Sequence, residues 1–175
     1  MAPTSCLRTP MTDHAWVIPY AKRVAEFLGL NAWEWTISHR SGLSTHRGLI
    51  LESPDATCFP NWPYLTAKIE IDSDCWIGRM AQPTTAGKLL ICHEMLHIAL
   101  AQLSHSMNEI INVYFPAEDK TPSDKTTAFT LYTNHEEHTI TRLSRQVYEA
   151  LERDEELARL RRKAKRLKKR RKQAA

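Results

Sequence analysis

The chain has few cysteines and no long apolar run, and each absence excludes a class of protein. Four cysteines stand far apart, with no C-x-x-C pair: Cys6, Cys58, Cys75 and Cys92. This spacing predicts neither a disulfide framework nor a thiolate zinc site. No stretch approaches the roughly 18 apolar residues of a membrane span, and residues 1–14 lack the apolar centre of a signal peptide. We therefore expect a cytoplasmic protein with reduced thiols that does not span a membrane.

Acidic residues are absent from the end of the sequence. Residues 159–175 hold 11 of the 24 Lys and Arg residues and no Asp or Glu. Residues 1–158 keep 13 basic against 20 acidic residues, so this part has a net charge of −7. We interpret residues 154–175 as a basic tail, helical or disordered, attached to an acidic body.

Basic blocks of this density release counterions from nucleic acid and bind it with a strong salt dependence. Nucleic acid is therefore a candidate partner, although the tail carries no base-reading motif and no aromatic residue. The alternatives are a solvated tail that aids solubility and a tail that folds back on the acidic body. The candidate contacts are Arg159, Arg161, Arg162, Lys163, Lys165, Arg166, Lys168, Lys169, Arg170, Arg171 and Lys172.

The most informative residues of the body are His93-Glu94-Met95-Leu96-His97, an H-E-x-x-H motif. Residues 88–103 contain no Pro or Gly and are mostly apolar, which predicts a buried helix. On a helix, His93 and His97 lie on one face and can bind one tetrahedral Zn²⁺. Glu94 lies about 100° round the helix, where it can take a proton from a zinc-bound water. The alternative is a core helix that carries two hydrogen-bonded histidines.

A hydrolytic zinc site has three protein ligands and leaves a fourth position for water. The metzincin arrangement would place a histidine six residues after His97, where this chain has Leu103. A second helix, expected over residues 133–151 with residues 134–138 in its first turn, is a better source of the third ligand. Its expected apolar stripe consists of Ile140, Leu143, Val147 and Leu151.

Extending that stripe one turn towards the start of the helix leads to Glu136, which is our candidate third ligand. Glu137 or His135 can replace it if the first turn is distorted. The competing interpretation is a solvated helix start with Asn134 as its N-cap, because acidic residues are favourable near the positive end of the helix dipole.

Three segments give the chain a resemblance to a known family: ICHEMLHIAL at 91–100, EEHTITRLS at 136–144 and YLTAKIEID at 64–72. Together they resemble the minimal gluzincin peptidases, and among these the small zincin-like proteins of bacteriophages and prophages. The resemblance implies an α+β domain over residues 14–153, with an N-terminal helix, a short mixed sheet, the H-E-x-x-H helix and a glutamate-bearing helix. The chain lacks the fuller Asn-Glu-x-x-x-Asp pattern, which leaves both Glu136 and Glu137 open.

The same resemblance implies a function. Zn²⁺ would be the cofactor, a peptide or protein the substrate, and Glu94 the general base of peptide-bond hydrolysis. The strand around residues 64–72 would be a sheet edge that pairs with an extended peptide. If the chain is phage-encoded, its compartment would be the bacterial host cytoplasm.

Local patterns complete the expected body. Residues 15–28 have helical periodicity and stop before Gly29, residues 33–38 and 64–72 alternate like strands, and a short strand is possible at 49–51. Residues 119–127 predict a polar loop. Residues 1–13 are expected to be a loose N-terminus.

Two other functions use the same residues differently. A DNA-associated protease of the SprT type would take a further histidine as third ligand, which here would be His105 or His135. A non-catalytic nucleic-acid-binding module would have a structural zinc. Glu94 favours an enzyme, because a structural site needs no carboxylate at that position.

Overall fold

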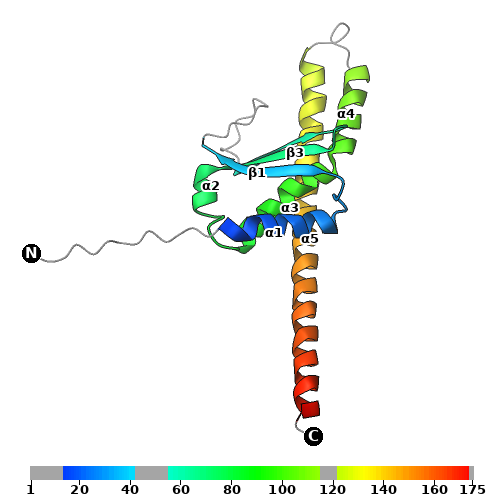
Figure 1. Ribbon diagram of the computed structural model, residues 1–175. Coiled ribbons are helices and arrows are strands. Elements are labelled where there is room, and N and C mark those ends of the chain that lie inside the picture. Colours follow the sequence, from blue (N-terminus) through cyan, green and yellow to red (C-terminus); the bar gives the residue numbers. More distant parts are fainter. Residues whose placement is uncertain (1–13, 42–54, 115–121, 174–175) are drawn as a thin grey trace, which may run out of the picture.

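A computed structural model describes residues 14–41, 55–114 and 122–173, and Figure 1 shows a mixed body crossed by one long helix. The elements are a 3₁₀ turn η1 (His14–Trp16), α1 (Val17–Phe27), β1 (Glu34–Arg40), β2 (Ala56–Asn61), β3 (Thr66–Asp72), α2 (Ser73–Ile77), α3 (Thr85–Ala99), α4 (Ala101–Tyr114) and α5 (Pro122–Gln173). The expected α+β class is confirmed.

The sheet has three strands in the order β1-β3-β2, with β1 parallel and β2 antiparallel to β3. Ala67, Ile69 and Ile71 of β3 alternate onto the buried face, as their spacing predicts. The expectation that this strand is a sheet edge is wrong, because β3 is paired on both sides. Strand β2 was not predicted from the sequence, because its Pro60 interrupts the pattern of a regular strand. Among the described strands, β1 and β2 are the edges.

Helix α1 packs against α3 with one apolar face. Its buried positions recur at helical spacing: Val17, Tyr20, Ala21, Val24 and Ala25. The Tyr20 hydroxyl lies 3.6 Å from the Cys92 Sγ on α3, which ties the two helices together. Gly29, with a φ of +72°, lies directly after the end of this helix, at the position where the sequence predicts a stop.

The expected helix over residues 88–103 is two helices. Thr84 caps the start of α3, because its side chain accepts a hydrogen bond from the Gly87 N–H at 3.1 Å. Helix α3 ends at Ala99 and α4 begins at Ala101. No Pro or Gly marks this junction, so sequence periodicity alone continues through it.

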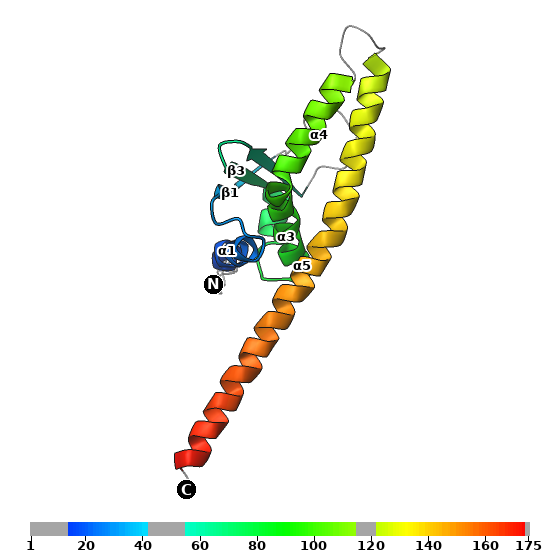
Figure 2. The ribbon, with the colours of Figure 1, turned by 90° about the vertical axis from the view of Figure 1, so that its right-hand side faces the viewer.

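Helix α5 is far longer than the helix expected from residue 133. It begins at Pro122 and therefore includes part of the expected loop at 119–127 and all of residues 135–138 in its interior. The N-cap assignment of Asn134 is therefore wrong. Helix α5 also continues without a break across residues 153 and 154. Figure 2 shows its first part beside α4, its middle against α3, and its last part beyond the body.

Some expectations fall outside the described residues, namely the loose N-terminus at 1–13 and the short strand at 49–51. Within the described parts of the chain, no helix combines the length and the apolar character that a membrane span requires.

Packing of α5 against α3 can be tested with two apolar residues of α5. Ile140 is fully buried, whereas Leu131 is 56% exposed. Ile140→Ala should lower the free energy of unfolding by about 2–4 kcal/mol, because it removes buried apolar surface and leaves a cavity. Leu131→Ala should change it by less than about 0.5 kcal/mol. Urea unfolding followed by circular dichroism measures both, and equal effects would contradict this packing.

Candidate metal centre

The H-E-x-x-H residues lie in the second half of α3, where His97 follows His93 by four positions, about one helical turn. His93 Nε2 and His97 Nε2 are 3.3 Å apart, and the rings are steeply inclined, at 67°. Their side chains are 23% and 19% exposed. The pair therefore faces the surface of the body, as expected if both histidines serve one ligand.

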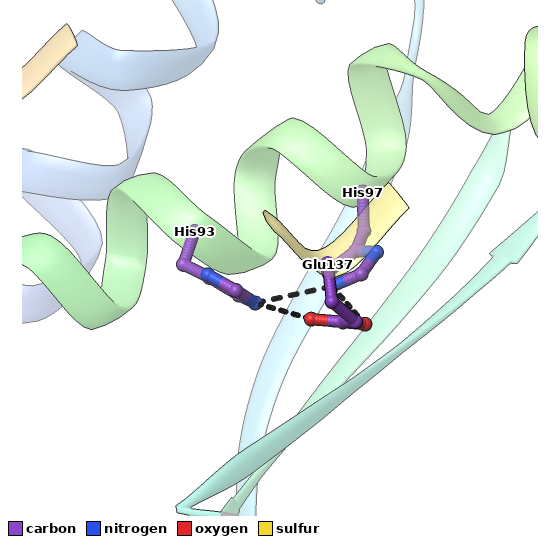
Figure 3. A group of neighbouring side chains, drawn as sticks. All are labelled: His93, His97 and Glu137. Carbon is purple, nitrogen blue, oxygen red and sulfur yellow. Dashed lines mark hydrogen bonds and ion pairs between the residues drawn. The ribbon is translucent and has the colours of Figure 1, made fainter. Parts of the chain in front are cut away.

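Glu137 of α5 completes a group of three. Its Oε2 lies 3.3 Å from His93 Nε2, and its Oε1 lies 3.5 Å from His97 Nε2. Figure 3 shows the three side chains converging between α3 and α5. Among the described residues, these three side chains form a group compact enough to hold a metal ion.

The geometry does not support the preference for Glu136 over its alternative, Glu137. The Glu136 carboxylate accepts a hydrogen bond from the Ser104 hydroxyl of α4 instead. The cause is the phase of the buried stripe on α5. Its buried members are Thr133, Ile140, Ser144, Val147 and Leu151.

Glu137 lies four residues after Thr133 and three before Ile140, so it continues this stripe at regular helical spacing. The stripe expected from the sequence included Leu143, which is half-buried, and left out Ser144, which is 5% exposed. Counting the polar Ser144 and Thr133 as inward positions would have led to Glu137.

Glu94 points away from solvent, next to the group of three. It is 3% exposed, and its Oε2 has no hydrogen-bond partner among the described residues. Burial raises the pKa of Glu94 to about 7, with the His93 imidazole acting against this shift and the Glu137 charge adding to it. An unpaired, buried carboxylate oxygen is costly in a purely structural role, so its position calls for a functional explanation.

The charges of the two glutamates act on His93. Burial alone would lower the pKa of His93, but the hydrogen bond to Glu137 and the charges of Glu94 and Glu137 outweigh it and leave that pKa raised. The surroundings of His93 therefore favour a positive charge at this imidazole. A bound cation would supply that charge directly.

The donor set fits a zinc ion. Zn²⁺ binds His nitrogen and carboxylate oxygen at about 2.0–2.2 Å, and a tetrahedral arrangement then separates the donor atoms by about 3.3–3.5 Å. The 3.3 Å between the two imidazole nitrogens matches such an edge, and the Glu137 carboxylate presents one oxygen to each imidazole, Oε2 at 3.3 Å from His93 and Oε1 at 3.5 Å from His97. Two nitrogens and one carboxylate also leave a fourth position for another ligand.

Strand β2 lies near Glu94. It packs against α3, and its Cys58 lies close enough to Glu94 for the carboxylate charge to act on the thiol. Burial and this charge together raise the pKa of Cys58 well above its ordinary value. The thiol is therefore protonated at neutral pH and is a poor competitor for the metal.

The other candidate ligands lie elsewhere. His105 is on α4 and His135 is on α5, and neither joins the metal-binding group in the described residues. The SprT-type ligand set therefore has no counterpart in this geometry. The basic residues from Arg159 onwards lie on the part of α5 that extends beyond the body.

Comparison of the chain with protein-family models, curated proteins and solved structures finds no match in any of the three.

The choice between the two glutamates can be tested by metal binding. Glu137→Ala should weaken zinc binding by more than about 100-fold, since loss of a direct ligand should cost at least as much as loss of a supporting residue. Glu136→Ala should change it by only a few-fold. Competition with a chelating dye measures both affinities, with His93→Ala as the variant expected to abolish binding. A larger loss in Glu136→Ala would mean that the register assigned to α5 is incorrect.

Proposed function

We propose that the protein is a zinc-dependent metallopeptidase of the minimal gluzincin type, with a zincin-like domain. The observation that supports this most strongly is the meeting of His93, His97 and Glu137 from two helices, with the buried Glu94 directly beside them. Each of the four residues then has a separate task.

The ligand set favours a catalytic over a structural ion. Structural zinc sites are closed by four protein ligands, often thiolates, whereas catalytic sites have three protein ligands and one open position. Here the group offers three protein donors, and Glu137 is 45% exposed on its outer side. Solvent and substrate can therefore reach the fourth position.

Zn²⁺ at this position would act as a Lewis acid, polarising a carbonyl oxygen and lowering the pKa of a water molecule. The work of the chain is to hold the reacting groups and to move protons. His93, His97 and Glu137 would hold the ion against α3. Glu94 accepts the proton of the attacking water through its unpaired oxygen and returns it to the leaving amine nitrogen.

Burial of Glu94 helps this proton transfer. Few water molecules can compete for a carboxylate that is 3% exposed, and a charge in such surroundings interacts strongly with its neighbours. His93 precedes Glu94 directly in the helix, so the base lies at a fixed distance from the ligands. Helix α3 thus supplies two ligands and the base from five consecutive residues.

Strand β2 is the candidate site for the substrate backbone. Strand β3 is paired on both sides, whereas β2 has a free edge among the described strands. An extended peptide can add to such an edge through main-chain hydrogen bonds, with little dependence on side chains. Because Cys58 brings β2 close to Glu94, a peptide bound there would pass the reacting groups.

The role of Glu94 can be tested by Glu94→Gln. This change keeps the size of the side chain but removes the proton acceptor, so cleavage of fluorescein-labelled casein or a mixed peptide library should fall by about 10²–10⁴-fold. Zinc content should stay the same, because Glu94 is not a ligand.

Glu109→Gln on the exposed side of α4 is the matched control and should retain full activity. Unchanged hydrolysis in Glu94→Gln would remove Glu94 as the base. Loss of zinc in that variant would instead assign it to the ligand set.

A further inference from the structure

The last part of α5 is a charged surface that the metal centre does not use. Residues 159–172, here called the basic rod, contain 11 Lys and Arg residues and no acid. Figures 1 and 2 both show this part of the helix leading away from the sheet and from α1, α3 and α4. This part of the helix therefore lies away from the rest of the body.

Side chains of the rod are not engaged by the body. Each residue from 159 to 170 is exposed, and no ion pair joins a described Lys or Arg of the rod to another element. An ion pair with the body comes earlier, where Glu155 pairs with Arg23 of α1 at 2.6 Å. The possibility that the tail folds back on the acidic body thus has no counterpart in this arrangement.

Helical structure gives the rod a charge density close to that of DNA. Fourteen helical residues span about 21 Å, so 11 positive charges correspond to about one charge per 1.9 Å. Double-stranded DNA carries about one negative charge per 1.7 Å of its axis. The two linear charge densities are nearly matched and of opposite sign.

We propose that the basic rod binds the phosphate backbone of nucleic acid. The contact depends on charge and on the straight helix, with no reading of base sequence, because the rod has no Asn, no aromatic residue and no base-reading motif. The body has a net charge of −7 and is repelled by phosphates. Nucleic acid is therefore held at the rod and away from the body.

Two other occupants fit the rod less well. Leu157, Leu160 and Leu167 form a narrow exposed stripe, which a second copy of the helix or a lipid surface could cover. Parallel pairing with a second copy would bring 11 positive charges beside 11 others. Three leucines provide a much smaller apolar face than an interfacial helix normally buries.

Continuity of α5 links the rod to the metal centre. Glu137 and Arg159 are 22 residues apart on one helix, which corresponds to about 33 Å. A protein cleaved at the proposed site would then lie about 33 Å or more from the bound phosphates. Binding itself does not depend on the proposed peptidase activity.

The test uses the full chain and two sets of substitutions with equal loss of charge. Arg162, Lys165 and Lys169 of the rod are changed together to Gln. The control changes three exposed basic residues of the body, Lys22, Arg142 and Arg145, to Gln. Fluorescence anisotropy then measures binding to three probes: double-stranded DNA of about 30 base pairs, and single-stranded DNA and RNA of about 30 nucleotides each. The salt concentration is varied over about 50–200 mM.

The unchanged chain should bind at least one of the three, with an affinity that falls steeply as salt increases. The rod variant should lose about 100-fold in affinity at about 0.1 M salt, and its salt slope should be smaller by about 2–3, since each lost phosphate contact removes about 0.9. The control should lose less than about 3-fold. The relative affinities of the three probes identify which nucleic acid is preferred.

Several results would overturn the proposal: equal losses in the two variants, no binding by the unchanged chain, or binding that salt does not weaken. It would also fail if the chain bound only vesicles that contain phosphatidylserine. The proposal would fail as well if the chain bound no nucleic acid but self-associated, and if the variant that combines Leu160→Ala with Leu167→Ala abolished this self-association. Zinc content should be equal in both Gln variants, which keeps this test separate from that of the metal centre.

Discussion

The contact between α3 and α5 is the constraint on which the metal centre depends. His93 and His97 come from one helix and are positioned by its geometry alone, but Glu137 reaches them only because α5 lies against α3. Burial of Ile140, Val147 and Leu151 fixes which side of α5 faces inward. The ion pair between Lys88 and Glu152, at 2.8 Å, adds to this contact but is partly exposed and contributes little stability on its own. Apolar packing thus sets the position of a polar ligand.

The same contact brings together polar groups that are costly to bury in a small body. Glu94 is buried with an unpaired oxygen, and two imidazoles lie close together next to a second carboxylate. Each of these groups would weaken a purely structural core. A bound cation and a catalytic task account for all of them at once. Since α5 continues into the basic rod, the helix that supplies Glu137 also carries the surface proposed to bind nucleic acid.

Much of this arrangement follows from local patterns. The alternation of Ala67, Ile69 and Ile71 predicts β3, Gly29 predicts the end of α1, and the His93 to His97 spacing predicts the histidine pair. The pairing of strands and helices that lie far apart in the sequence is harder to predict. Strand β2 contains Pro60 and becomes a strand only because β3 offers it a partner, so β3 could not be recognised as central. Glu137 was ranked second because the inward face of α5 includes the polar Thr133 and Ser144, which an apolar stripe does not reveal.

The central claim is that His93, His97 and Glu137 bind one zinc ion with an open fourth position. Zinc K-edge X-ray absorption of the protein loaded with one equivalent of Zn²⁺ tests it most directly, because it reports the donor atoms and their distances. We expect two imidazole nitrogens and the remaining oxygen donors at about 2.0–2.2 Å, with no sulfur. The imidazole signal should disappear in the variant that combines His93→Ala with His97→Ala. A sulfur donor at about 2.3 Å, which would implicate a cysteine such as Cys58, or an unchanged spectrum in that variant, would contradict the claim.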